Sequence, residues 1–240
     1  MNLIRLSKSS IGSKEKKAVS KVLDREYLGM GEEVNKFEAN LNSYLSKSKS
    51  YIACVNSGTA ALQLSLQALG VKEKDKVLVP SLNFVSGIQA ISATGATPVF
   101  CDVLMENFTI DPTDIKKKIT KDVKVIMPVH YSGASANMEA INKIAKKSKL
   151  FVIEDSAHAF GSYNNKNKLI GTGENLSCFS FDGIKNITSG EGGAVFTKNK
   201  ALYDKICDYR LLGVHKDTLK RYSNKRSWDF DVFEQGWRYH

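Results

Sequence analysis

Short apolar runs, rich in β-branched residues and bounded by turn residues, recur along the chain and predict β-strands. Between most of them, apolar positions return every three to four residues, which is typical of helices packed on one face. We predict strands over Tyr51–Val55, Lys76–Pro80, Pro98–Val103, Val123–Val129, Leu150–Glu154, Ser177–Phe181 and Gly193–Thr197. We predict helices over Lys14–Leu23, Glu33–Leu45, Thr59–Leu69, Phe84–Thr94, Pro112–Ile119, Asn137–Lys147 and Asn199–Tyr209.

The alternation of strand and helix along most of the chain predicts the fold class. Near-continuous apolar strands joined by helices indicate βαβ units and a parallel sheet covered on both faces. We therefore expect an α/β protein with a mostly parallel, seven-stranded sheet sandwiched by helices. The sequence contains no internal repeat, low-complexity tract or Pro- or Ser-rich linker, so this core should form one domain.

The composition is that of a folded globular protein. Of 240 residues, 42% are hydrophobic and 25% charged, which excludes the disordered, collagen-like and membrane classes. No apolar run approaches the roughly 18 residues that span a bilayer, and the start lacks the apolar centre of a signal peptide. The four cysteines form no CxxC pair and are too few for a disulfide scaffold. We expect a protein of the reducing cytoplasm, without a membrane partner.

Positive charge exceeds negative charge, with 35 Lys and Arg against 25 Asp and Glu. Such a surplus can indicate an anionic partner such as nucleic acid. Few of the basic residues are Arg, however, although base reading and phosphate clamping generally depend on Arg. The lysine clusters fall on the polar faces of predicted helices, so solvated helix faces explain them better. We predict no nucleic-acid binding.

In an open parallel sheet, ligands bind beyond the carboxyl ends of the strands, so the residues after each strand are the first candidates for chemistry. After the first strand, Asn56–Leu62 forms a Ser/Thr/Gly turn that opens an apolar helix. Free amides at this helix start, the positive end of the helix dipole and the Thr59 hydroxyl suit a phosphate. An ordinary N-cap at Ser57 or Thr59 is the alternative interpretation.

The fifth predicted strand ends in Glu154, and Asp155 and His158 follow. Two carboxylates and an imidazole therefore gather at its carboxyl end, where acids seldom stand without a function. A magnesium-binding acid of an ATPase is one interpretation, but the sequence has no GxxxxGK(S/T) loop to hold the phosphates. For His158, a satisfied, half-buried histidine is the alternative to a functional one.

After the sixth predicted strand, Lys185 stands in a Gly-rich turn at the same sheet edge as Asp155. Shielding from solvent favours the neutral form of a lysine amine. A neutral amine facing a carboxylate and a phosphate cradle is what a Schiff base with pyridoxal phosphate (PLP) requires. Taken together, Lys185, Asp155 and the turn at Ser57 indicate PLP as cofactor.

Further signatures occur in order along the chain. They are LSKSSIG from Leu6, GMGEEV from Gly29 with Phe37 and Glu38, NSGTAAL, PSLNFV, GATPVFCDV, PVHYSG, VIEDSAHAFGS, FSFDGIKNITSGEGGAVFT and the closing GWRYH. With these signatures the sequence resembles the sugar aminotransferases of the DegT/DnrJ/EryC1/StrS family, within the fold-type-I PLP enzymes. The resemblance covers essentially the whole chain.

The resemblance implies a role for each site residue. Lys185 joins the cofactor covalently and then acts as general base and acid, while Asp155 keeps the pyridine nitrogen protonated. His158 approaches the phenolic oxygen of the cofactor, where many relatives carry Gln. Phe84 lies against the open face of the cofactor ring, with simple core packing as its alternative. The residues implied to hold the phosphate are Ser57, Gly58, Thr59 and Ala60, with Ser180 as a further donor.

The resemblance also implies a reaction. Glutamate gives its amino group to the cofactor, which passes it to a keto group on a nucleotide-linked 6-deoxy sugar, in the biosynthesis of a surface polysaccharide such as the lipopolysaccharide O-antigen. Relatives that dehydrate sugars carry His at the place of Lys185, so Lys185 favours transamination. A PLP enzyme acting on amino acids fits the GATPVFCDV and GEGGAV segments less well. Fold-type-I sites are usually shared between subunits, so we expect a homodimer, and no metal.

The end of the chain leaves a second function open. From Val214 to His240 the sequence is polar and aromatic, and it stops without another strand or a capped helix. Members of the family continue beyond this stretch with a small C-terminal domain. We therefore expect residues 1–240 to comprise an N-terminal segment and the PLP-binding large domain, without the small domain. The alternative function is a catalytically silent homologue that binds PLP or a full-length partner without turnover.

Overall fold

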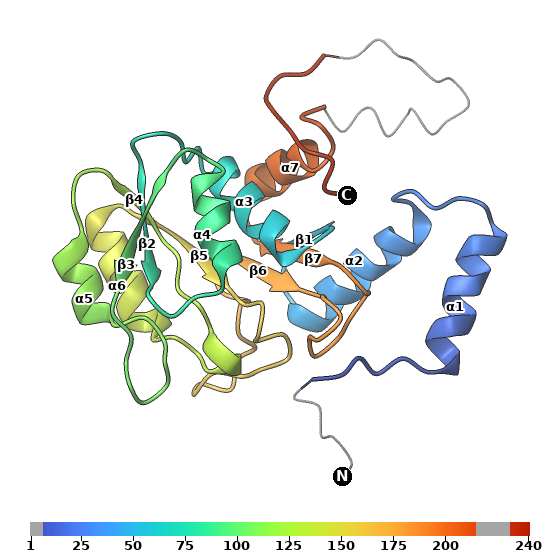
Figure 1. Cartoon of the computed structure of the whole chain (residues 1–240), viewed down its shortest axis with the longest axis horizontal. Coiled ribbons are helices and arrows are strands. Elements are labelled where there is room, and N and C mark those ends of the chain that lie inside the picture. Colours follow the sequence, from blue (N-terminus) through green and yellow to red (C-terminus); the bar gives the residue numbers. More distant parts are fainter. Residues whose placement is uncertain (1–6, 215–230) are drawn as a thin grey trace.

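A computed structural model describes residues 7–214 and 231–240 of the chain. In these residues a seven-stranded sheet runs in the order β1-β7-β6-β5-β4-β2-β3 (Figure 1). The strands are β1 Tyr51–Val55, β2 Lys76–Pro80, β3 Thr97–Cys101, β4 Val123–Ile126, β5 Phe151–Asp155, β6 Leu176–Ser180 and β7 Gly193–Thr197. Leu6, the first residue of the opening signature, and positions 215–230 of the chain's closing stretch lie outside the described residues.

The sheet is mostly parallel, as predicted. Strands β3, β2, β4, β5 and β6 run parallel to one another, and only β7 runs antiparallel to both of its neighbours, β6 and β1. The carboxyl ends of β1, β2, β4, β5 and β6 therefore share one edge of the sheet. This edge brings together the segments that the sequence marks as candidates for chemistry.

The predicted fourth strand is too long, because it ends at Ile126 and not at Val129. Pro128 has no N–H to give to the ladder, although its carbonyl accepts the Asp155 N–H at 2.9 Å. The predicted third strand is also too long, because it ends at Cys101 and not at Val103. The next N–H, that of Asp102, donates to the Asp114 carboxylate at 2.8 Å. The other predicted strands agree with the structure to within one residue at each end.

Seven α-helices surround the sheet in the described residues. They are α1 Ser13–Asp24, α2 Glu32–Leu45, α3 Gly58–Ala68, α4 Val85–Ser92, α5 Pro112–Lys118, α6 Met138–Ser148 and α7 Lys200–Tyr209, with a short 3₁₀ turn over Tyr131–Gly133. The predicted helices agree to within two residues at each end. Short polar side chains begin several of them: Ser57, Asp111, Asn137 and Asn199 each accept a backbone N–H of the first turn.

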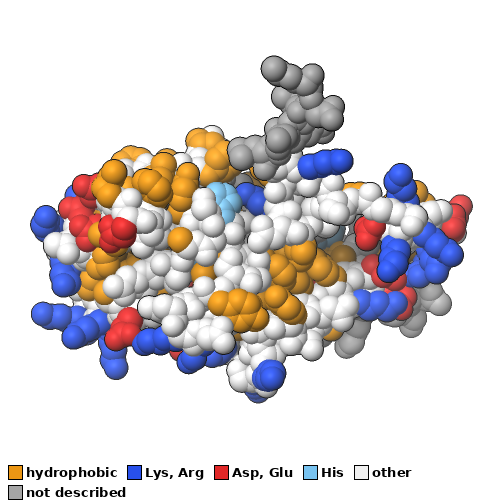
Figure 2. Space-filling view, turned by 90° about the horizontal axis from the view of Figure 1, so that it is seen from below, with side chains coloured by type: hydrophobic (Ala, Val, Ile, Leu, Met, Phe, Trp, Pro, Cys, Tyr) orange, Lys and Arg blue, Asp and Glu red, His pale blue; other side chains and the backbone are white. Residues whose placement is uncertain are grey.

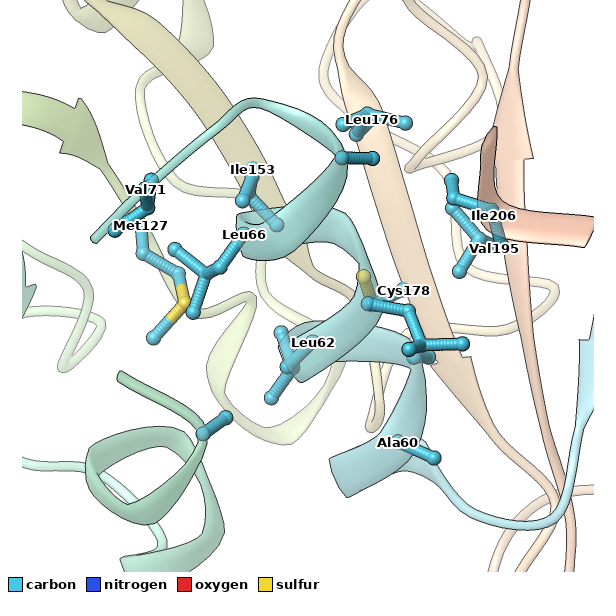
Figure 3. Packing of buried hydrophobic residues seen from close by; sticks show 14 of the residues in the cluster. Ala60, Leu62, Leu66, Val71, Met127, Ile153, Leu176, Cys178, Val195 and Ile206 are labelled. Atoms are coloured by element: carbon cyan, nitrogen blue, oxygen red, sulfur yellow. The ribbon is translucent and has the colours of Figure 1, made fainter. Parts of the chain in front are cut away.

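Helix α3 packs on the middle of the sheet and is buried along most of its length. Figure 3 shows Leu66 of α3 beside Ile153 of β5 and Met127, the residue after β4, and these three belong with Leu62 to one apolar cluster. Helices α4 and α7 contribute to the same cluster. On the opposite face of the sheet, α5 and α6 cover one apolar cluster and α2 covers another. The sheet is thus sandwiched by helices, as predicted.

Helix α1 differs from the others because none of its residues is buried. Figure 1 shows it beyond α2, away from the sheet. On the face drawn in Figure 2, Lys and Arg side chains lie mainly toward the two ends of the molecule, with acidic side chains among them. None of the helices in the described residues is long and apolar enough to cross a membrane.

Candidate active site

A cavity of about 480 Å³ lies at the shared carboxyl edge of the strands, beside the start of α3. Its walls come from the turn after β1, the loop before α4, and the segments that follow β4, β5 and β6. The predicted site residues that line it are Ser57, Gly58, Thr59, Phe84, Asp155, His158, Ser180 and Lys185. The fold thus brings eight of the nine predicted residues to one cavity. Ala60 is not among its lining residues.

The turn after β1 forms a cradle of backbone amides. Ser57 is the N-cap of α3, because its hydroxyl accepts the Ala60 N–H at 3.1 Å. The N-cap interpretation of this turn is therefore confirmed, and it accounts for the amide of Ala60. The N–H groups of Gly58 and Thr59, in the first turn of the helix, have no partner within it and remain available to an anion.

Glycines allow the cradle to lie close to the neighbouring strands. A Cβ at Gly58 would lie 3.0 Å from the Cβ of Ser180, so a side chain here would crowd Ser180, and glycine lets the start of α3 lie close to its hydroxyl. A Cβ at Gly193, the first residue of β7, would lie 2.4 Å from the Ser57 carbonyl oxygen. The GEGGAV segment therefore has a physical reason for its glycine at this position, since β7 packs directly behind the cradle.

Asp155 ends β5 and is buried, with 5% of its surface exposed. Its Oδ1 accepts the Ala157 N–H at 3.1 Å. Burial raises the pKa of this carboxyl, while the Ala157 amide, His158, His130 and Lys185 oppose the rise. A buried carboxyl of raised pKa facing a cavity is stabilised when a cation or a protonated nitrogen arrives beside it.

His158 is half-buried on the cavity wall. Its Nδ1 accepts the Ser132 N–H at 3.4 Å. Its ring packs edge-on against the Tyr131 ring, with the two ring centroids 6.0 Å apart. Burial and the nearby Lys185 lower the pKa of His158, with Asp155 acting in the opposite direction. His158 is thus half-buried and partnered, as the alternative interpretation predicted, and it also lines the cavity.

Lys185 lies in the turn that joins β6 to β7 and is partly buried. Its N–H donates to the Asp182 carbonyl at 3.0 Å, and the Asp182 carboxylate accepts the Ile184 N–H at 3.1 Å. The Phe181 carbonyl closes the turn by accepting the Ser189 N–H at 3.0 Å. These bonds hold a lysine at the edge of the cavity, facing the segment of Asp155 and His158.

Phe84 lines the cavity and is 71% exposed, so the core-packing alternative for this residue is wrong. Beside it, the side-chain amide of Asn83 also lines the cavity, and its buried oxygen and nitrogen have no hydrogen-bond partner. Sequence reasoning missed Asn83 and also Tyr131, another residue of the cavity wall. Both follow a strand, which is the signal that could have identified them.

Glu154 does not reach the cavity, although it stands next to Asp155. Side chains alternate along a strand, so Glu154 points to the α6 face of the sheet, where it is buried. Its carboxylate meets His130 Nε2 at 3.0 Å and accepts the Asn175 side-chain N–H at 2.7 Å. The expectation of two carboxylates gathered at this site is therefore wrong: one faces the cavity and the other faces away.

Metal ligands are not grouped in the part of the chain that the structure describes. Across residues 7–214 and 231–240, no cluster of three or more His, Cys, Asp and Glu side chains could hold a metal ion. The four cysteines all have free thiols.

Known proteins are similar to this chain in sequence and in fold. The profile of the DegT/DnrJ/EryC1/StrS aminotransferase family matches residues 9–234. GDP-perosamine synthase of Escherichia coli O157:H7 is 42% identical over 216 residues, which are 89% of this chain and 58% of that protein. The spore coat polysaccharide biosynthesis protein SpsC of Bacillus subtilis is 37% identical over 95% of this chain and 58% of its own length.

Solved structures of aminotransferases have the same fold as this chain. PseC of Helicobacter pylori, an aminotransferase involved in the biosynthesis of pseudoaminic acid, superposes with a TM-score of 0.86 at 30% identity, over 98% of this chain and 61% of that chain. This chain thus spans about 58% of the length of the curated relatives that it matches. Because the family profile matches residues 9–234, which are most of the chain, the chain belongs to the DegT/DnrJ/EryC1/StrS aminotransferase family.

Proposed function

We propose that this chain is the PLP-binding part of a sugar aminotransferase. The single observation that carries the proposal is the cavity that unites Lys185, Asp155, His158 and the amide cradle at Gly58 and Thr59. An amine, a buried acid and an anion cradle are three separate requirements of the cofactor, and the fold supplies all three at one sheet edge.

The residues present fit PLP. The free amides of Gly58 and Thr59, with the Ser57 and Ser180 hydroxyls beside them, suit its phosphate. Asp155 would hold the pyridine nitrogen, because a protonated nitrogen beside this carboxyl offsets the cost of its burial. The exposed ring of Phe84 would cover the ring of the cofactor.

PLP bound here would supply the electron sink that lets an amino group leave one carbon and join another. The chain's own part is positioning and proton transfer. The Lys185 amine, held at the cavity edge, is the group placed to remove and return a proton at the substrate carbon. Asp155 is kept from solvent. Its carboxylate would keep the ring nitrogen protonated, and the positive charge on that nitrogen attracts electrons.

We further propose glutamate as amino donor and a nucleotide-linked keto-6-deoxy sugar as acceptor. The printed functions of relatives support this choice, since one is a GDP-perosamine synthase and another an aminotransferase of pseudoaminic acid biosynthesis. We also propose a homodimer. Phe84 and Ile184, at 71% and 61% exposure, leave apolar surface at the cavity that a second subunit would cover.

Addition of glutamate to the PLP-loaded chain tests the proposed activity. We expect the absorption of the cofactor to change and 2-oxoglutarate to appear, detected by mass spectrometry, with D-glutamate as the inactive control. The second half-reaction is then tested with nucleotide-linked keto sugars. A chain that binds PLP through Lys185 but releases no 2-oxoglutarate would contradict the proposed turnover and favour the silent homologue.

A further inference from the structure

A polar cluster is buried behind the site, on the α6 face of β5. His130 is fully buried and Glu154 is 4% exposed, and His130 Nε2 lies 3.0 Å from Glu154 Oε2. The other carboxylate oxygen, Oε1, accepts the Asn175 side-chain N–H at 2.7 Å. Both carboxylate oxygens thus have a partner. A buried acid paired in this way is costly to disrupt, because removal of one partner leaves the other unsatisfied.

The hydrogen bonds of His130 determine where its ring proton lies. Its Nδ1 accepts the Ala136 N–H at 3.1 Å, so Nδ1 carries no proton. The proton is therefore on Nε2, which donates it to the Glu154 carboxylate. In addition, the His130 backbone N–H donates to the Asp155 carbonyl at 3.0 Å. His130 is thus fixed by its ring and by its backbone to the strand that carries Asp155.

The turn that follows His130 is held in a strained conformation. Ser132 has φ +50°, in the left-handed region that a residue with a Cβ seldom adopts. Such a conformation persists when the surrounding structure determines it. Here His130 fixes the start of the turn, and its carbonyl accepts the Gly133 N–H at 3.2 Å.

This conformation directs the Ser132 N–H at His158. The N–H donates to His158 Nδ1 at 3.4 Å, and the neighbouring Tyr131 ring packs edge-on against the imidazole. Because Nδ1 acts as an acceptor, the proton of the neutral His158 ring is on Nε2. His158 can then donate one hydrogen bond to an oxygen of a ligand in the cavity.

We propose that Glu154 and His130 are positioning residues for His158. They fix the 131–133 turn so that the Ser132 N–H holds His158 Nδ1 as an acceptor and the ring proton stays on Nε2. The nature of the oxygen that receives this proton, the phenolic oxygen of PLP, rests on the proposed function. The positioning itself concerns only residues of this chain and can be measured without cofactor.

Long-range ¹H–¹⁵N spectra of the ¹⁵N-histidine-labelled chain, without PLP and above the pKa of His158, report the tautomer directly. The spectrum of His158→Gln assigns the His158 signals. We expect the wild-type ring to carry its proton on Nε2 alone. In Glu154→Ala we expect the His158 signals to shift toward the tautomer mixture of a solvated histidine. Glu174→Ala removes an exposed carboxylate and is the matched control, with wild-type signals expected.

Glu154→Gln keeps an acceptor for His130 and should restore the wild-type tautomer. Glu154→Asp keeps the charge but is one methylene shorter, so it replaces Glu154→Ala if that variant does not fold. Circular dichroism establishes folding for each variant. A folded Glu154→Ala or Glu154→Asp chain in which His158 keeps its proton solely on Nε2 would overturn the proposal.

Binding of PLP gives a second readout. Loss of one oriented hydrogen bond in Glu154→Ala should weaken PLP binding roughly fivefold, with Glu154→Gln close to wild type. Equal affinity in Glu154→Ala and wild type would also count against the proposal. If wild type itself forms no Lys185-dependent complex with PLP, the proposed function fails, while the tautomer spectra still decide whether Glu154 and His130 position His158.

Discussion

Glu154 and Asp155 are neighbours on one strand, but their surroundings are opposite. Glu154 faces α6, and both of its carboxylate oxygens are paired, with His130 and with Asn175. Asp155 faces a cavity, where burial raises its pKa, and among the described residues its carboxylate accepts a hydrogen bond from the Ala157 backbone amide alone. Polar groups satisfied within the fold stabilise it, whereas a buried polar group that faces an open cavity is available to a ligand. Substitutions at open positions should therefore change binding directly, whereas substitutions at enclosed positions should change stability and affect binding only through a positioned neighbour such as His158.

The largest loss of stability is expected at an enclosed apolar position, Leu66 of α3. This side chain is fully buried against the sheet, close to Met127 and Ile153 (Figure 3). Leu66→Ala should lower the free energy of unfolding by about 2–5 kcal/mol, measured by urea denaturation. The PLP affinity of the chains that remain folded should be unchanged. A loss below about 1 kcal/mol would show that α3 is not firmly packed.

A large effect on binding is expected at Asp155. Asp155→Asn keeps the shape of the side chain but removes the charge that a protonated pyridine nitrogen would meet. Loss of a hydrogen bond to a charged group costs about 2 kcal/mol, so PLP affinity should fall roughly thirtyfold in an absorption titration. The matched control is Asp231→Asn, at an exposed position. Equal affinities for Asp155→Asn and wild type would remove Asp155 from the site.

The raised pKa of Asp155 also predicts a pH dependence of stability. In the cofactor-free chain, the folded state holds this proton more tightly than the unfolded state, whose carboxyl has a pKa near 3.9. The contribution of Asp155 to stability is therefore greatest at low pH and is lost as pH rises from about 4 through the raised value. The stability of Asp155→Asn relative to wild type should grow over this interval. A difference that stays flat would contradict the raised pKa.

The smallest effect is expected at Phe84, the most exposed of the large apolar residues of the cavity wall. Its ring is 71% exposed, so Phe84→Ala should change the free energy of unfolding by less than about 0.5 kcal/mol. PLP affinity should nevertheless fall, because the cofactor ring loses an aromatic contact of about 1 kcal/mol, equivalent to roughly fivefold. Thermal unfolding and PLP titration of the same variant separate the two effects. A stability loss larger than the binding loss would mean that Phe84 belongs to the core.

Sequence patterns predicted the sheet, the helices and eight residues of the cavity wall, for physical reasons. Apolar strands that end in polar residues place Asp155 and Lys185 at one edge, whatever the details of packing. The direction of a single side chain was harder to predict. Glu154 and Asp155 occupy opposite faces because of the strand's alternation, and which of the two faces the cavity depends on how the strand packs in the fold.

Other features depend on details of local geometry or on contacts between distant segments. The Ala60 N–H donates to the Ser57 hydroxyl and so is not free for an anion. This bond depends on the geometry of the helix cap, and the identity of residue 60 does not reveal it. Phe84 looks like a core residue in an apolar segment, but α4 begins only at the next position and leaves its ring exposed. The left-handed conformation of Ser132 has no local sign in the PVHYSG segment, and in our proposal it depends on His130, whose backbone N–H donates to Asp155 at the end of β5.

The central claim, that this cavity binds PLP through Lys185, is tested most directly by the visible absorption spectrum of the purified chain with added PLP. Lys185→Ala is compared with wild type, and Lys168→Ala, at an exposed lysine, controls for reaction of PLP with surface amines. We predict a visible band that survives gel filtration in wild type and Lys168→Ala and is lost in Lys185→Ala. Identical spectra for all three chains would contradict the account.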